Sequence, residues 1–179
     1  FDGKLDDIRI YGYALSADQV KKICNTTSPT QPVDTSLVGH WTFDGTDMQG
    51  TTAIDRSSFG NNGTITGAVP TIGKLGQALQ FNGSTDLVDI PTNSSIDQQS
   101  KFSFCAWVYA TGWGGNSEGV VGFKGYAPAG GKWYAYLLNS GSEASFAGAC
   151  DAATTSAWSK ASNSSFSLNV WTAAHFGLC

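Results

Sequence analysis

The sequence predicts an all-β fold, a two-sheet sandwich of antiparallel strands of jelly-roll type, with one short helix near the N-terminus. Short segments rich in β-branched and aromatic residues follow one another at intervals of roughly 8–15 residues. Turn-forming residues separate them, including 22 Gly. Only 13% of the 179 residues are charged, which suits outer strand faces that are polar but uncharged.

The first predicted strand covers residues 5–11, LDDIRIY. Its side chains alternate, so that Ile8 and Ile10 point to one face while Asp7 and Arg9 point to the other. We therefore expect one buried face.

A helix is expected over residues 17–23, because Ser16 and Gln19 form a capping box ahead of it. Residues 25–36 hold two Pro and many Ser and Thr, which favours an extended linker over a regular element.

The rest of the chain reads as a series of strands. The segments 78–81 and 86–91 flank Asn-Gly-Ser-Thr and predict a hairpin. Both faces of 101–111 are apolar, which is typical of a strand in the middle of a layered sheet. The remaining expected strands are 37–43, 118–125, 132–141, 144–150 and 168–179, with a Ser/Ala-rich loop before the last.

Residues 45–64 form a long turn-rich stretch between two of these strands. Within it, Asn62-Gly63 is a strong signal for a tight turn. We expect Asp55, Asn61 and Asn62 to hold this stretch in shape through hydrogen bonds to the backbone.

Four motifs resemble the laminin-G-like group of the concanavalin A-like lectin/glucanase superfamily. They are LVGHWTFDG followed by TTAIDRSSFGNNGTITG, GKLGQALQFNGSTDLVDIP, FSFCAWVYAT, and FDGKLDDIRIYGYALSADQV. Arg56 and Phe59 depart from the family pattern in the first motif, as do Leu5 and Gln19 in the last. The resemblance implies a concanavalin A-like jelly roll of two antiparallel sheets.

The family's closing motif comes first in this chain. We therefore expect residues 1–23 to be the closing strand and helix of a preceding repeat, 24–36 to be a linker, and 37–179 to be a laminin-G-like domain that is incomplete at its C-terminal side. First and last strands of such jelly rolls lie side by side, so Leu5–Tyr11 should pair with Leu37–Phe43. A linker of about a dozen residues can span ~40 Å, which allows this pairing.

Composition excludes several classes of function. A net charge of −4 and a pI of about 4.9 argue against nucleic-acid binding. No apolar run approaches the ~18 residues that insertion into a membrane requires.

The four Cys form no Cys-x-x-Cys pair, which argues against zinc. Their spacing leaves two disulfides and buried thiols equally open. Glycosylation sequons permit an extracellular location; they begin at Asn25, Asn62, Asn82, Asn93 and Asn163.

The sequence does not favour an enzyme. Glucanases of this superfamily need two carboxylates flanking the scissile bond. The acidic residues after position 100 are Glu118, Glu143 and Asp151, and they do not share a strand. His40 and His175 lie within predicted strands, where a structural role is expected.

A binding site is better supported, because sugar rings stack on exposed aromatic side chains beside polar groups. Trp113 lies in a Gly-rich turn with Asn116, and Tyr126 borders the next loop. We expect these three residues to contact ligand, although Trp113 could equally fold over a sheet edge. Core positions are expected for the remaining tryptophans and for one of the adjacent pair Trp133 and Tyr134; those tryptophans are Trp41, Trp107 and Trp171.

Relatives often carry Ca²⁺, which needs six to eight oxygen ligands. The candidate carboxylates are Asp6, Asp7, Asp44, Asp47 and Asp86. If the first and last strands pair, Asp44 approaches Asp6 or Asp7, and either a cation or Arg9 must offset their repulsion. We take Asp6 and Asp44 as the metal candidates, with capping of backbone amides as the alternative role.

The resemblance implies a non-catalytic recognition module of the cell surface or extracellular space, binding glycan or a matrix polymer beside neighbouring repeats of a larger chain. The alternatives are a structural spacer repeat without ligand and an accessory domain of a glycoside hydrolase. Glycan binding measured with and without EDTA separates the first two.

Overall fold

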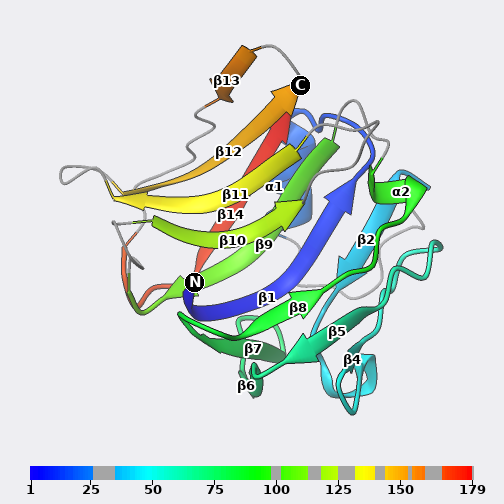
Figure 1. Ribbon diagram of the computed structural model, residues 1–179, viewed down its shortest axis with the longest axis vertical. Helices are drawn as coiled ribbons and strands as arrows, with labels where there is room; N and C mark the ends of the chain where they lie inside the picture. Colours follow the sequence, from blue (N-terminus) through cyan, green and yellow to red (C-terminus); the bar gives the residue numbers. More distant parts are fainter. Residues whose placement is uncertain are drawn as a thin grey trace.

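The computed structural model describes residues 1–25, 35–97, 102–112, 118–124, 132–139, 144–152, 155–159 and 167–178. These residues are mostly β, with few and short helices (Figure 1). In chain order the elements are β1 (Asp2–Tyr11), α1 (Ala17–Asn25), β2 (Leu37–Trp41), a 3₁₀ turn (Gly45–Asp47), β3 (Met48–Gln49), β4 (Thr52–Ala53), β5 (Gly63–Thr66), β6 (Val69–Ile72), β7 (Gln77–Asn82), β8 (Leu87–Asp89), α2 (Ser94–Asp97), β9 (Phe102–Ala110), β10 (Glu118–Lys124), β11 (Lys132–Asn139), β12 (Ala144–Ala152), β13 (Thr155–Ser159) and β14 (Thr172–Leu178).

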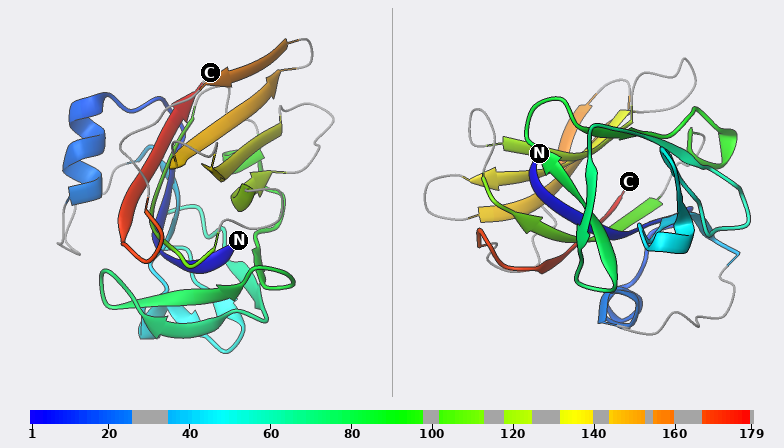
Figure 2. Two further views of the ribbon diagram at one scale, coloured as in Figure 1. Left: turned by 90° about the vertical axis from the view of Figure 1, so that its left-hand side faces the viewer. Right: turned by 90° about the horizontal axis from the view of Figure 1, so that it is seen from below.

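The strands form antiparallel sheets. The largest has six strands in the order β14-β9-β1-β7-β6, with β2 also paired to β1. A four-stranded sheet runs β10-β11-β12-β13, and a smaller one runs β3-β4-β5-β8. Figure 2 shows α1 on one face of the six-stranded sheet and the β10–β13 sheet on the other. We call these the outer face and the inner face.

Strand β1 lies inside the six-stranded sheet. Its second half pairs with β2, with Ile8 opposite Trp41 and Ile10 opposite Gly39. Its first half pairs with β7, and β9 lies along its other edge. The predicted pairing of Leu5–Tyr11 with Leu37–Phe43 is therefore confirmed.

The expectation of a single buried face on β1 is wrong. Asp7, Arg9 and Tyr11 are as buried as the apolar side chains that alternate with them. Helix α1 lies over this face (Figure 2), where its Ile23 lines a small pocket with Asp7 and Arg9, and the charges of these two side chains neutralise one another.

Helix α1 confirms the predicted capping box. The Ser16 amide donates to Gln19 Oε1 at 2.9 Å, and the Gln19 amide donates to Ser16 Oγ at 3.3 Å. The segment before the helix is held by Ser103 of β9, whose Oγ accepts from the Leu15 amide at 2.8 Å. Val20 is buried where α1 packs on β9 and β14. Neither helix of the described part is long and apolar enough to cross a membrane.

The main core lies on the inner face. Strand β9 runs between β14 and β1, which confirms its predicted central position. Its side chains Phe104 and Val108 pack with Leu5 of β1 and with Trp41 of β2, which is only 1% exposed. Burial of such side chains contributes about 1.5–3 kcal/mol each, so β1 and β9 together anchor the domain.

The predicted hairpin between 78–81 and 86–91 is wrong. Strand β7 pairs with β1 and β6, while β8 pairs with β5 in a different sheet. The Asn82 side chain explains the difference, because its Oδ1 accepts from the amides of Ser84, Thr85 and Asp86. This wide loop redirects the chain instead of folding it back on itself.

Three smaller expectations also fail. The tight turn lies just before Asn62-Gly63, where Gly60 has a φ of +68°, and Gly63 already belongs to β5. The stretch expected as a Ser/Ala-rich loop contains β13. Strand β14 begins at Thr172 instead of at residue 168. The three remaining strands, β10, β11 and β12, are found where the alternation predicts them.

Candidate functional site

The site begins with an irregularity in β1. The register between β1 and β9 shifts between Asp6 and Arg9, and Asp7 has a φ of +50°. A bulge of this kind re-aims side chains, and a non-glycine residue in left-handed backbone costs about 1–3 kcal/mol. Here it directs two adjacent carboxylates into different surroundings, both within the protein: Asp6 is 0% exposed and Asp7 is 8% exposed.

Asp6 holds the turn that joins β6 to β7. Its Oδ2 accepts from the amides of Lys74 and Leu75 at 2.7 and 2.8 Å. Asp44, which precedes the 3₁₀ turn after β2, also holds the turn between β6 and β7, since its Oδ1 accepts from the Gln77 amide at 2.8 Å. Gly76 lies in this turn with a φ of +68°, and a Cβ there would collide with Asp44. The expectation that Asp44 approaches the Asp6-Asp7 pair is confirmed.

Asp6 is electrostatically strained. Burial is the main cause that raises its pKa from the usual 3.8 to about 7, and the charges of Asp7 and Asp44 raise it further. The two backbone hydrogen bonds act in the opposite direction and only partly offset these effects. Its second oxygen, Oδ1, is buried and has no hydrogen-bond partner. Such an atom is costly to leave unsatisfied.

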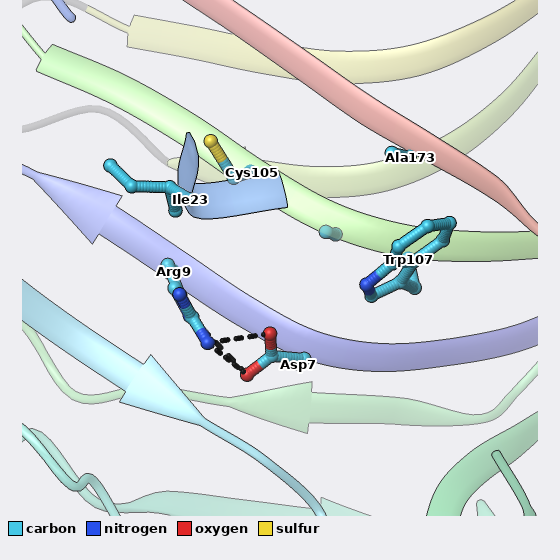
Figure 3. Close-up of a pocket in the computed structure, with 7 residues that line it drawn as sticks. Asp7, Arg9, Ile23, Cys105, Trp107 and Ala173 are labelled. Carbon is cyan, nitrogen blue, oxygen red and sulfur yellow. Dashed lines mark hydrogen bonds and ion pairs between the residues drawn. The ribbon is translucent and has the colours of Figure 1, made fainter. Parts of the chain in front are cut away.

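Asp7 belongs to a buried charge cluster (Figure 3). Its Oδ2 lies 2.9 Å from Arg9 Nη2, and its Oδ1 lies 2.7 Å from His40 Nε2. Burial alone would raise the pKa of Asp7, but the hydrogen bond from His40 and the charge of Arg9 outweigh it and lower the pKa below 3.8. Arg9 therefore compensates Asp7, which leaves Asp6 uncompensated.

Two further buried carboxylates stabilise the loops around the small β3-β4-β5-β8 sheet. Asp55 accepts from the His40 amide at 2.8 Å and from the Asn61 amide at 2.8 Å, while Asn62 Oδ1 accepts from the Asp55 amide at 2.9 Å. The structural role expected for these three residues is confirmed. Asp47 Oδ2 lies 2.7 Å from Arg56 Nε, so the arginine that departs from the family pattern has an ion-pair partner.

Aromatic side chains line the part of the outer face that α1 leaves open. Trp107 and Tyr109 of β9 point to this face, and the Trp171 ring lies 5.5 Å from the Tyr109 ring. All three are half-buried and lie outside the core cluster. The expectation of a core position is therefore confirmed for Trp41 and wrong for Trp107 and Trp171, because a nine-residue helix is too short to cover the whole face.

Lysines lie over two of these rings. Lys74 Nζ is 5.1 Å from the centroid of the Trp107 ring, and Lys4 Nζ is 5.3 Å from that of Tyr109. Both distances fall within the range of cation–π attraction. We call Trp107, Tyr109 and Trp171 with these two lysines the lysine–aromatic row. Sequence reasoning missed it, although the alternation of Trp107 and Tyr109 against the inner residues of β9 was a usable signal.

A small pocket lies between the C-terminal half of α1 and the outer face of the sheet (Figure 3). Arg9, Ile23, Cys105 and Trp107 are among its lining residues. Cys105 is a buried thiol outside any disulfide, and it lies opposite His175 of β14, whose pKa is lowered by burial. His40 and His175 both lie in strands, as predicted.

The predicted ligand residues Trp113, Asn116 and Tyr126 lie outside the described residues, and so do the side chains of Trp133 and Tyr134. Within the described ranges, no group of three or more His, Cys, Asp or Glu side chains is arranged to hold a metal ion. Any cation at Asp6 and Asp44 would therefore need backbone oxygens or water as further ligands.

Comparison with protein-family models, with characterised proteins and with solved structures finds no match to this chain.

Asp7 provides a test of the charge cluster. We expect Asp7→Asn to lower the free energy of unfolding by about 3–5 kcal/mol, because it leaves Arg9 buried without its counter-charge. Asn keeps the size of the side chain and tolerates the left-handed backbone, so that charge is the main change. Urea unfolding at pH 7 measures the effect. Asp18→Asn, at an exposed position in α1, is the control and should cost less than about 1 kcal/mol. Equal losses in the two variants would contradict the assignment.

Asp6 provides a test through the pH dependence of stability. Its folded pKa of about 7 lies above the unfolded value, so the folded protein binds an extra proton between about pH 4 and pH 7. The parent should therefore lose up to about 3 kcal/mol of stability through this group between pH 5 and pH 8 in EDTA. Asp6→Asn should remove that loss. Parallel pH profiles of urea midpoints for parent and variant would show that Asp6 is not strained.

Proposed function

We propose that this protein is a non-catalytic extracellular recognition module that binds carbohydrate or a matrix polymer. The lysine–aromatic row is the observation that carries this proposal. Half-buried Trp and Tyr side chains gathered on one sheet face offer the flat apolar surfaces on which sugar rings stack. Three such rings beside one another are costly to expose unless a partner covers them.

The state of the carboxylates supports a function without catalysis. Asp6, Asp7, Asp47 and Asp55 are the buried carboxylates of the described part, and each one accepts hydrogen bonds that fix a turn or a strand pair. Glycosidase chemistry needs two carboxylates that face a substrate cleft. These carboxylates instead accept hydrogen bonds from backbone amides and side chains close to them.

We also propose that the fold is a laminin-G-like jelly roll of the concanavalin A-like type, from a chain of tandem repeats. The pairing of β1 with β2 supports it, because that is the pairing the motif order predicts. The contact of Asp6 with the Gly73–Gly76 turn supports it as well, since it joins two of the four motifs.

Calcium fits the Asp6–Asp44 site on two grounds. Asp6 Oδ1 is buried without a partner, and Asp6 and Asp44 repel one another across the turn they share. A divalent cation would satisfy the oxygen and offset the repulsion. Asp6 and Asp44 are the residues that would hold it. Its contribution would be to stabilise the turn between β6 and β7, which carries Lys74 of the row.

Melting in calcium tests this site. At pH 8, a calcium concentration about a hundred times its Kd should stabilise the parent by about 2.7 kcal/mol and raise its Tm by several degrees over that in EDTA. Asp6→Asn and Asp44→Asn should each abolish the difference, while Asp18→Asn should keep it. A parent that melts at the same temperature in calcium and in EDTA would exclude the cation.

A glycan array tests the recognition function. We expect the parent to retain a defined set of glycans, and Trp113→Ala to lower that retention if the predicted Gly-rich turn contributes to the site. Repeating the array in EDTA shows whether calcium supports binding. A parent that retains no glycan under any condition would favour the structural spacer.

A further inference from the structure

We propose that the lysine–aromatic row binds an acidic polysaccharide, one whose sugar units carry carboxylate or sulfate groups. This inference rests on the proposed function and names its site and its class of ligand. The rings would stack against sugar faces, and the lysines would pair with the acidic substituents.

The three rings gather on the outer face of the sheet. Trp107 and Tyr109 are two residues apart on β9, which places their side chains on one face about 6.6 Å apart. Trp171 lies beside Tyr109, on the segment that leads into β14, at a ring separation of 5.5 Å and a tilt of 56°. A row of this form suits an extended chain that contacts several rings in succession, more than it suits a single small molecule.

The lysines are available for a ligand. Lys4 and Lys74 form no ion pair with any carboxylate in the parts of the chain that the structure describes, and each lies against an aromatic ring instead. The protein as a whole carries a net charge of −4. Two ammonium groups that have no carboxylate partner among the described residues therefore give this face a local positive charge, which favours an anionic ligand.

The backbone presents both lysines firmly. Lys4 belongs to β1 and lies opposite Tyr109 in the strand register. The turn that carries Lys74 is tied down at its own amide by Asp6. A ligand that pairs with these groups pays less of the ordering cost that mobile surface lysines impose.

The charges decide between acidic and neutral sugars. A neutral chain could stack on the rings, but it would have to share their faces with the lysines and would leave both ammonium groups without a counter-charge. An acidic chain satisfies both kinds of group at once. Binding should accordingly weaken as salt screens the charges.

The experiment measures binding of the 179-residue chain to polygalacturonate, dextran sulfate and neutral dextran by affinity electrophoresis. We expect polygalacturonate or dextran sulfate to retard the protein strongly and dextran to do so weakly or not at all. Lys4→Gln and Lys74→Gln should each weaken binding to the acidic polymer about threefold to fivefold, as the loss of an exposed ion pair does. Trp171→Ala should weaken it more than tenfold.

Matched controls separate this site from general effects. Lys22→Gln removes the same charge from an exposed position on α1, and Phe59→Ala removes an exposed ring that lies away from the row. Both should bind like the parent, and circular dichroism should show that all variants are folded. Loss of binding at 500 mM NaCl would further support the proposal.

The outcomes distinguish two failures. If the parent binds none of the three polymers and no glycan on the array, both the recognition function and this inference are wrong. If it binds glycans but the row variants bind as well as the parent, or if it binds neutral dextran as tightly as the acidic polymers, the recognition function stands and this inference is wrong.

Discussion

The structure depends on the insertion of β1 between β9 on one edge and β2 and β7 on the other. Backbone hydrogen bonds along both edges make this strand the link between the two ends of the six-stranded sheet. Leu5 and Ile10 carry it into the core. Its outward side chains Asp7 and Arg9 lie under α1, in a small pocket that Ile23 also lines, so their charges must be satisfied within the protein.

Asp6 and Asp7 meet that requirement to different degrees. Both carboxylates are desolvated, yet their pKa values move in opposite directions. Asp7 gains Arg9 and His40, whereas Asp6 gains only backbone amides and the repulsion of two neighbouring carboxylates. The bulge at this point keeps Asp7 away from the apolar inner face. Without it, adjacent side chains on a regular strand would lie on opposite faces, and Asp7 would face the apolar core.

Sequence reasoning succeeded where the information is local or belongs to a motif. The capping box at Ser16 needs only neighbouring residues, and the pairing of β1 with β2 followed from the order of the motifs. It failed where a side chain's distant partner decides the outcome. Alternation showed that both faces of β9 are apolar, but the length of α1 decides that Cys105 is fully buried and Trp107 only half-buried. Likewise, the turn signal at Asn82 could not reveal that its side chain ties down a loop and sends β8 to another sheet.

The strained carboxylate and the exposed row are physically connected. Asp6 bonds the amide of Lys74, and the side chain of that same residue lies over Trp107, directly opposite Asp6 in the strand register. Substitution of Asp6 therefore alters both the stability of the frame and the position of one cation on the surface. Lys4 and Trp171 have no such contact with Asp6, since Lys4 lies opposite Tyr109 in the β1–β9 register and the Trp171 ring packs against the same tyrosine. An effect of an Asp6 substitution on binding would therefore act through the position of Lys74, whereas Lys4→Gln and Lys74→Gln each remove a charge from the row itself.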